Sequence, residues 1–524
     1  MVEPASTVAP TSSRAQIRGS SLLLFGRAIA MGVNFLVQIL TVRYLTKTDY
    51  GAFAYALSIV DLGQMIATFG MDRTVTRFLS IYDEERRYHR LFGTLVFSLS
   101  TVASLGLAVI LVVDGLQALS AGGLMAGDGH AATLLGILIL LAPIQAFDAV
   151  LTGVLSVFAS PRSIFLRRFV LAPGLKLTVI LLLVLSQAGV DFLAWGYVVA
   201  GLIGLIVYGF LLARLLRVRG LSAQLRWRAL DVPIRELMLF TVPLLTTDLV
   251  YIALNTSDAV LLGWFRGSED VAAFRVVIPA AGLNQLVFSS FTLLFVPAAA
   301  RLFARNDRAG VRDLYWQTAI WMAVVSFPLF ALTFSLAGDL TRVLYGARYE
   351  SSALYLAMLS FAYYFNTALG FNGLTLRVYG AVRSIVLINV AAASMNIVLN
   401  LLLIPVLGPL GAAIGTSTTL VVHNILKQIG LNRATGISLF EPRYLRVYVV
   451  LAAGAVGLLC VQLFWSPIFV VEFALAGLVS LVVFGLTRSE LRIADTFPEI
   501  TRIPVIGRIL GSAGSRGPDD SGPA

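Results

Sequence analysis

Uncharged apolar runs of roughly 20 residues recur along the chain and are separated by short polar connections. A helix of that length crosses the ~30 Å hydrocarbon core of a bilayer. The runs are too continuous for the alternating strands of an outer-membrane barrel. Runs bounded by charge, glycine or proline predict about 14 membrane spans, near 20–41, 51–71, 91–113, 131–157, 169–187, 192–213, 237–263, 271–299, 314–337, 353–376, 384–404, 409–426, 447–465 and 467–486. The pattern therefore predicts an all-α polytopic membrane protein.

Composition supports this fold class and excludes others. Of the 524 residues, 58% are hydrophobic and 13% are charged, and the mean hydropathy is +0.87. A soluble domain is nearer half apolar and a quarter charged. The single cysteine, Cys460, and three scattered histidines exclude an intrachain disulfide and a multi-cysteine metal site. No connection has room for a soluble catalytic domain and no phosphate-loop motif occurs, so we expect no enzyme, no catalytic residue, no metal and no cofactor.

The basic residues are distributed unevenly between the two sets of connections. The N-terminal tail and the connections after even-numbered spans hold 31 of the 39 Lys and Arg residues. The connections after odd-numbered spans hold five, and the spans themselves hold Arg27, Lys176 and Arg275. The positive-inside rule then predicts a multi-pass protein of the cell (plasma or inner) membrane with both termini cytoplasmic. The net charge of +11 thus requires no nucleic-acid partner.

Two segments recur at an offset near 220 residues. Arg162–Leu166 returns as Arg383–Leu387, and Thr46–Phe53 is echoed by Arg266–Phe274. Two six-span units would share one orientation, as in transporters whose lobes rock about a central site, although chance similarity between apolar segments is the alternative. The expected organisation is a disordered tail (1–19), an N-lobe (20–214), a linker (215–236), a C-lobe (237–430), two extra C-terminal spans (431–487) and a cytoplasmic tail (488–524).

Polar residues form stripes inside several predicted spans. Arg27, Asn34 and Gln38 share one helical face in span 1. The others are Lys176 in span 5, Asp248, Asn255 and Asp258 in span 7, and Asn389, Asn396 and Asn400 in span 11. Intramembrane polar groups normally face a partner or a wet cavity. We interpret the stripes as walls of a hydrated cavity between the lobes.

Two interpretations of these residues remain open. Cations in a cavity suit an anionic head group such as a diphosphate, and buried carboxylates suit proton or cation exchange. Alternatively, Arg27, Asp61, Asp148 and Asp248 form structural ion pairs, and the asparagines hold helices together.

The segment Gly380–Ser417 resembles the signature of a known family. The matching elements are Gly380 and Arg383 before a span, Asn396 and Asn400 within it, Leu403-Ile404-Pro405, and Gly411-Ala412-Ala413. This pattern is similar to that of the polysaccharide transporters (Wzx-type flippases) of the multidrug/oligosaccharidyl-lipid/polysaccharide (MOP) exporter superfamily. Near the N-terminus, Asp49-Tyr50-Gly51 and Thr76-Arg77-Phe78 resemble the same family. The resemblance covers roughly residues 20–430.

The resemblance implies a flippase that moves a polyprenyl-(di)phosphate-linked oligosaccharide from the cytoplasmic to the outer leaflet by alternating access. It implies head-group binding by Arg27, Asn34, Gln38, Lys176, Asn255, Asn389, Asn396 and Asn400, and coupling to H⁺ or Na⁺ by Asp248 and Asp258. The expected partners are this lipid-linked substrate and the bilayer, and the protein is expected to act as a monomer. The alternatives are a cation-coupled drug or small-molecule antiporter of the same superfamily, and a flippase for a lipid-linked peptidoglycan precursor. A membrane-embedded glycan polymerase or glycosyltransferase is disfavoured because the outward connections are short.

Overall fold

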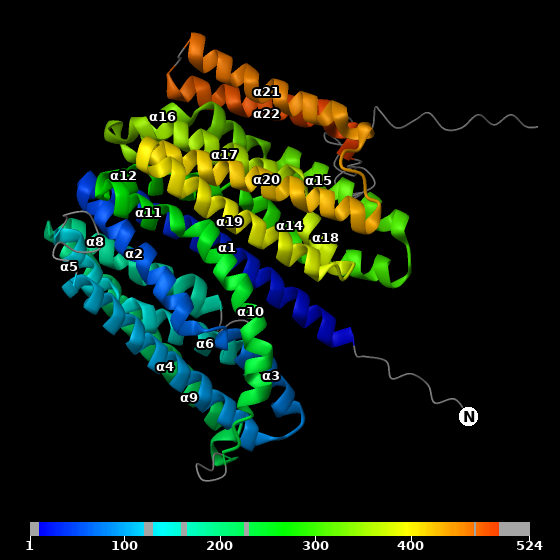
Figure 1. Cartoon of the computed structure of the whole chain (residues 1–524). Helices are drawn as coiled ribbons and strands as arrows, with labels where there is room; N and C mark the ends of the chain where they lie inside the picture. Colours follow the sequence, from blue (N-terminus) through cyan, green and yellow to red (C-terminus); the bar gives the residue numbers. More distant parts are fainter. Residues whose placement is uncertain (1–9, 120–128, 159–164, 225–229, 466–467, 492–524) are drawn as a thin grey trace, which may run out of the picture. The chain divides into compact units, whose positions relative to one another are not determined.

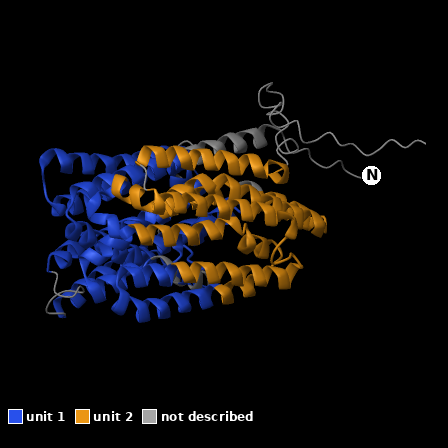
Figure 2. Ribbon diagram, turned by 90° about the horizontal axis from the view of Figure 1, so that it is seen from above, with its two compact units in different colours: residues 1–279, 344–352, 389–416 blue, residues 280–343, 353–388, 417–524 orange. Residues whose placement is uncertain are grey.

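The computed structural model describes residues 10–119, 129–158, 165–224, 230–465 and 468–491, and the regular elements in these ranges are all helical (Figure 1). The predicted all-α class is therefore confirmed. The chain divides into two compact units (Figure 2). Unit 1 comprises residues 1–279, 344–352 and 389–416, and unit 2 comprises residues 280–343, 353–388 and 417–524.

Unit 1 consists mainly of the N-terminal half of the chain. Its helices are α1 (Pro10–Tyr44), α2 (Lys47–Thr68), α3 (Met71–Glu84), α4 (Tyr88–Leu119), α5 (Gly129–Leu138), α6 (Leu141–Phe158), η1 (Leu166–Leu171), α8 (Ala172–Ser186), α9 (Val190–Val218), η2 (Leu221–Gln224), α10 (Ile234–Asn255), α11 (Ser257–Arg266), α12 (Ser268–Arg275) and η5 (Ala347–Ser352). It also holds most of α19 (Val382–Leu407) and the first residues of α20 (Pro409–Thr435), and it ends within α13 (Ile278–Gly282).

Unit 2 consists mainly of the C-terminal half. Its helices are α14 (Gln285–Ala304), α15 (Arg308–Phe330), η4 (Ala331–Ser335), α16 (Ala337–Tyr345), α17 (Ala353–Ala368), α18 (Asn372–Val378), η6 (Pro442–Tyr444), α21 (Leu445–Phe464) and α22 (Phe469–Leu491), with the remainder of α13, α19 and α20. The last two residues of α16 belong to unit 1.

Each predicted span coincides with one helix or with a broken helix. By length and apolar composition, ten of the described helices can cross a membrane, or eleven if Ser268–Gly282 and Gln285–Thr292, bent by 45°, form one span. The other three predicted spans lie in α1, in α10 with α11, and in α20. The protein is thus a polytopic helical membrane protein, as predicted.

Local sequence explains the breaks that shape unit 1. Thr46 caps α2, because its side chain accepts a hydrogen bond from the Asp49 N–H at 3.1 Å. The helix ends where Phe69 and Gly70 adopt left-handed conformations, with φ of 48° and 67°. The chain then enters α3, whose Met71, Val75 and Leu79 are buried in the core of the unit.

A π-helical turn interrupts span 5 and carries two arginines. Pro173 has no backbone N–H, so the α-helical hydrogen bond from position 173 cannot form. In η1, the Ala172 N–H instead donates to the Arg167 carbonyl five residues back. Such π-bulges rotate the helix and occur frequently at functional sites. Here the bulge sets the direction of Arg167 and Arg168.

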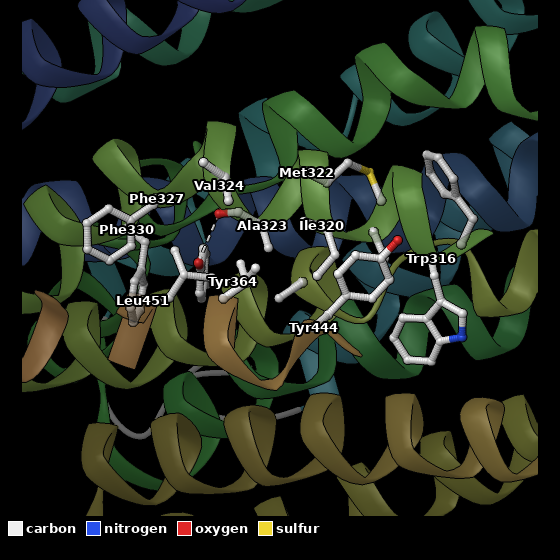
Figure 3. Close-up of a cluster of buried hydrophobic side chains, with 14 of the residues drawn as sticks. Trp316, Ile320, Met322, Ala323, Val324, Phe327, Phe330, Tyr364, Tyr444 and Leu451 are labelled. Atoms are coloured by element: carbon white, nitrogen blue, oxygen red, sulfur yellow. Dashed lines mark hydrogen bonds between the residues drawn. The ribbon is translucent and has the colours of Figure 1, made fainter. Parts of the chain in front are cut away.

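Unit 2 is built around α15 and a cluster of aromatic side chains (Figure 3). The rings of Phe330 and Tyr364 stack with centroids 4.0 Å apart, and the Tyr364 hydroxyl donates to the Ala323 carbonyl at 2.9 Å. The polar tip of the tyrosine is therefore satisfied within an apolar core. The C-terminal helices α21 and α22 pack against each other and against α15, so the two extra spans share the core of this unit (Figure 1).

Candidate functional site

A polar cavity of about 830 Å³ lies within unit 1 and is lined by α2, α3, α6, η1, α8 and α9. Its charged lining residues are five cations and three carboxylates: Arg73, Arg77, Arg167, Arg168, Lys176, Asp61, Asp72 and Asp148. Hydroxyl and amide groups of Gln64, Gln145, Thr152 and Tyr197 complete its polar wall. An accessible polar cavity inside an apolar bundle can hold water or a polar ligand.

Arg167 is buried and fixed on three sides. Its guanidinium forms an ion pair with Asp148, lies 3.9 Å from the Tyr208 ring centroid, and donates from Nε to the Gly204 carbonyl at 3.4 Å. A Cβ added at Gly204 would lie 2.6 Å from Arg167 Nη2, so the glycine makes the space that the arginine occupies. The positive charge of Arg167 is therefore neutralised inside the wall.

A second cation of the cavity is also paired. Arg73 on α3 donates to the Asp248 carboxylate on α10 at 2.7 Å. Asp248 is half-buried, whereas the Arg73 side chain remains accessible. The pair joins the cavity wall to α10.

The other three cations are accessible and form no ion pair, although Asp61 interacts electrostatically with Lys176 and Asp148 with Arg168. Arg77, Arg168 and Lys176 are exposed on the wall, and no ion pair involves them in the part of the chain that the structure describes. Arg77 lies 4.7 Å from the Phe240 ring centroid, and Lys176 Nζ lies 5.6 Å from that of Tyr197. Aromatic faces hold these cations without neutralising them. They can therefore donate to an incoming anion, and arginine provides a fork that matches phosphate oxygens.

The carboxylates extend the electrostatic network toward α12. Asp61 interacts electrostatically with Lys176 and with Arg275. Arg275 donates to the Ser58 hydroxyl at 2.5 Å, while its Nε is buried without a partner. Arg275 thus lies against α2, close to the Asp61 side of the cavity.

Lys176 is the predicted site residue that lines this cavity. Arg27 and Asn34 are exposed on α1 and are not part of its lining. Gln38 donates to the Val276 carbonyl at 3.1 Å and so contacts backbone just after α12. The shared chamber that the sequence led us to expect between the lobes stays a prediction.

Two asparagines of α19 are hydrogen-bonded, one bond joining α19 to α11 and the other lying within α19. Asn396 and Asn400 are buried, and the Asn396 side-chain oxygen accepts from Ser257 at 3.1 Å and from Asn400 at 3.3 Å. Asn389 is half-buried, and the side chain of Asn255 lies outside what the structure describes. The contacts of Asn396 and Asn400 match the alternative in which asparagines hold helices together. Head-group binding by these residues stays a prediction.

The two predicted coupling carboxylates have different surroundings. Asp248 pairs with Arg73, as described above. Asp258 is 3% exposed, and its Oδ1 accepts from the Ala259 N–H at 2.7 Å. It also interacts electrostatically with Arg275. Ion coupling by either carboxylate stays a prediction.

Sequence reasoning missed most of the charged lining. Arg73, Arg77, Arg167 and Arg168 were counted as topology-setting residues of cytoplasmic connections. The sequence signal for Arg167 and Arg168 is their position shortly before Pro173. A proline can induce a π-helical turn there, so that the helix begins earlier than hydropathy indicates and includes both arginines.

Unit 2 has an apolar cavity of about 450 Å³. Aromatic residues dominate its wall, including Phe330, Tyr364 and Phe365, and the Tyr448 hydroxyl donates to the Ala368 carbonyl at 3.1 Å. The tyrosine hydroxyls that we can place bond to backbone, so this wall offers little polarity to a sugar. Tyr364 and Phe365 thus contribute to packing in this wall.

Comparison with known proteins identifies the family. A family model described as polysaccharide biosynthesis protein matches residues 17–303, and a MatE model matches residues 243–402. An uncharacterized membrane protein of Methanocaldococcus jannaschii is 24% identical over 418 residues, covering 76% of this chain and 80% of the relative. The EPS I polysaccharide export inner membrane protein EpsE of Ralstonia nicotianae is 26% identical over 360 residues, covering 67% and 79%.

Solved structures with the same fold include two transporters. The lipid II flippase MurJ in an inward closed conformation matches with a TM-score of 0.66 at 14% identity, covering 91% of this chain and 99% of that chain. An inward-facing multidrug resistance MATE family transporter of the MOP superfamily matches with a TM-score of 0.61 at 14% identity, covering 78% and 95%. The fold is therefore that of a two-lobe MOP transporter. Because the first family model covers more than half of the chain, the protein belongs to the polysaccharide biosynthesis protein family, and the resemblance to the polysaccharide transporters of the MOP superfamily is confirmed.

Proposed function

We propose that the protein is a flippase that moves a polyprenyl-(di)phosphate-linked oligosaccharide from the cytoplasmic to the outer leaflet, for the biosynthesis of a cell-surface polysaccharide. The observation that carries this proposal is the cavity of about 830 Å³, whose lining includes three accessible cations that form no direct ion pair with any described residue. Such cations are costly in a membrane unless they face water or an anion. A diphosphate head group supplies the compensating negative charge.

In this mechanism, Arg77, Arg168 and Lys176 bind the phosphate oxygens, while the ion pairs of Arg73 and Arg167 keep the wall in place. Bidentate bonds from the two arginines fix the orientation of the head group. The lipid tail stays in the bilayer during the passage. Access to the cavity alternates between the two membrane sides, and the chain performs no covalent step.

Residues outside the cavity complete the proposal. Arg27, Asn34, Gln38, Asn255, Asn389, Asn396 and Asn400 are further candidates for contacts with the head group. Asp248 and Asp258 are candidates for coupling to H⁺ or Na⁺. The functional unit is a monomer in the cell membrane, with both termini on the cytoplasmic side.

The proposal is tested by removing the unpaired cations in cells that lack their own copy of the gene. A charge-assisted hydrogen bond contributes about 1.5–3 kcal/mol, which is roughly a tenfold to hundredfold effect on binding. We expect Arg77→Ala, Arg168→Ala and Lys176→Ala each to lower the rate of surface glycan export at least about tenfold. We expect the triple variant to abolish export at unchanged protein abundance.

The matched control is Arg217→Ala at the exposed C-terminal end of α9, which is outside the cavity and should leave export unchanged. Arg27→Ala, alone and with Lys176→Ala, tests whether α1 also contributes. Wild-type export by the triple variant would refute the anion site. Transport of lipid II or of a cationic drug by reconstituted protein, without transport of a lipid-linked oligosaccharide, would favour the peptidoglycan-precursor flippase or the antiporter instead.

A further inference from the structure

A buried carboxyl group in unit 2 plays no part in the proposed cavity. Glu472 lies in the first turn of α22, beside α21 (Figure 1), and is 1% exposed. Both of its carboxyl oxygens are buried and accept no hydrogen bond from a protein donor in the described part of the chain. The protein therefore encloses this carboxyl group.

The group that faces Glu472 is another carboxyl. Asp339, in the first turn of α16, lies within hydrogen-bonding reach of the Glu472 side chain, and the two groups interact electrostatically. Both belong to unit 2. Glu472 is buried and Asp339 is half-buried, so little water reaches the pair. Two carboxylates this close repel each other strongly in such a site when both are ionised, unless a counter-charge is present.

The helices α15, η4 and α21 pack on α22 and supply no counter-charge to the pair. Arg342 lies three residues after Asp339 on α16, but its side chain is exposed and forms no ion pair with a described residue. Within the described ranges, no Lys, Arg or His forms an ion pair with Glu472 or Asp339. The charged residues of α15 occupy its first two turns, and Arg446 of α21 pairs with Glu490 at the opposite end of α22, at 3.6 Å. The described residues also contain no group of three carboxylate, His or Cys ligands that could hold a metal ion.

The backbone around the pair is irregular. The π-helix η4 ends one residue before α16, and the Ser335 hydroxyl donates to the Ala455 carbonyl of α21 at 3.0 Å. A Cβ added at Gly338 would lie 3.2 Å from the Gln462 side-chain nitrogen, so α21 approaches the start of α16 closely. The site is therefore built by three helices and not by the end of one.

We propose that Glu472 and Asp339 form a binding site for one exchangeable proton in unit 2. The proton lies in a hydrogen bond in which the carboxylic acid of one residue donates to the carboxylate of the other. Uptake of the proton cancels one of two like charges, and its release leaves two carboxylates that repel each other. The site is separate from the cavity of unit 1 and shares no residue with it.

The test is infrared difference spectroscopy of the full-length protein in lipid vesicles, which detects the C=O stretch of protonated carboxyl groups. An exposed glutamate, with an ordinary pKa of about 4.3, is fully ionised at pH 7. We expect the wild type to retain a protonated-carboxyl band at pH 7 that disappears in alkali and returns on acidification. Glu472→Gln should remove the band. Asp339→Asn should either remove the band or change the pH range over which it disappears.

The matched control is Glu490→Gln on the same helix, which should keep the wild-type band because Glu490 is ion-paired with Arg446. Thermal unfolding of each variant verifies that it is folded. If Glu472→Gln does not fold, the infrared spectrum of Asp339→Asn tests the proposal instead. Absence of the band in the wild type at pH 7, or its survival in both variants, would overturn the proposal. Loss of the wild-type band on addition of Na⁺ or Ca²⁺ at fixed pH would also overturn it, because the pair would then hold a metal ion.

Use of this proton in transport rests on the proposed function and is measured separately. A pH gradient across vesicles should accelerate flipping by the wild type and not by Glu472→Gln, which carries no exchangeable proton at this position. If the band behaves as expected and the gradient still accelerates the variant, the proton site stands and its coupling to transport is refuted. Failure of all flipping in the wild type would count against the proposed function alone.

Discussion

At the residue scale, the wall of the unit 1 cavity separates two kinds of cation. Arg167 is 6% exposed and has its counter-charge in Asp148, whereas Arg77, Arg168 and Lys176 are accessible and form no direct ion pair among the described residues. Burial of a charge is tolerated only when it is paired and hydrogen-bonded. The first kind therefore maintains the shape of the wall, and the second kind is available to a ligand.

This separation predicts a large loss of stability when the Arg167 pair is broken. Asp148→Asn leaves a buried guanidinium without its counter-charge, which costs about 3 kcal/mol of the free energy of unfolding, since Asp148 is itself partly accessible. The measurement is unfolding of the purified protein in detergent. Replacement of both residues, as Asp148→Asn with Arg167→Met, should recover most of the loss, because no buried charge remains.

The control for this prediction is Glu84→Gln at the exposed end of α3, where a surface substitution changes stability by no more than about 0.5 kcal/mol. Equal stability of Asp148→Asn and the wild type would show that Arg167 finds another counter-charge. A double variant less stable than either single variant would show that the two residues act independently.

At the element scale, the two segments that resemble each other in sequence lie side by side. Thr48 near the start of α2 donates to Glu269 of α12 at 3.2 Å, and Lys47 Nζ lies 4.0 Å from the same carboxylate. Gly51 brings the two backbones together, because an added Cβ would overlap the Ser268 carbonyl group. The two similar segments therefore contribute both sides of one helix–helix contact in unit 1.

The contact predicts that Gly51→Val separates α2 from α12. We expect cysteines at positions 48 and 269, in a Cys460→Ser background, to be joined by a short thiol cross-linker. Addition of Gly51→Val should abolish the cross-link, because the new side chain cannot overlap a backbone carbonyl. Gly115→Val on α4 is the matched control, since nothing lies within 4 Å of its Cβ position. Undiminished cross-linking with Gly51→Val would show that the helices approach each other differently.

At the scale of the whole molecule, the fold was predictable because each span must satisfy its own backbone hydrogen bonds in lipid, which leaves a long apolar helix as the solution. Hydropathy locates such helices without knowledge of their neighbours. The site depends on tertiary pairing that hydropathy does not contain. Arg73 meets Asp248 from 175 residues away, and the direction of Arg167 depends on a π-helical turn next to Pro173. Lys176 was predictable because it interrupts an otherwise apolar span.

The orientation of the whole protein in the membrane is also predicted from its sequence. Of the 39 basic residues, 31 occupy the N-terminal tail and the connections after even-numbered spans. Basic connections are retained on the cytoplasmic side. The test uses single cysteines in a Cys460→Ser background, at Glu84 after the second span and at Glu350 after the ninth, both of which are exposed. An impermeant thiol reagent should label Glu350→Cys in intact cells and Glu84→Cys only after permeabilisation.

Because one error in the number of spans would reverse every later connection, the pair of positions tests the count together with the orientation. Seven predicted spans, the third to the ninth, separate Glu84 from Glu350, and this odd number of crossings places the two residues on opposite sides of the membrane. Labelling of both residues in intact cells would mean that a helix between them does not cross the membrane. Labelling of Glu84→Cys alone in intact cells would show that the topology is the reverse of the predicted one. Substrate would then have to approach the cations of the unit 1 cavity from the opposite side of the membrane.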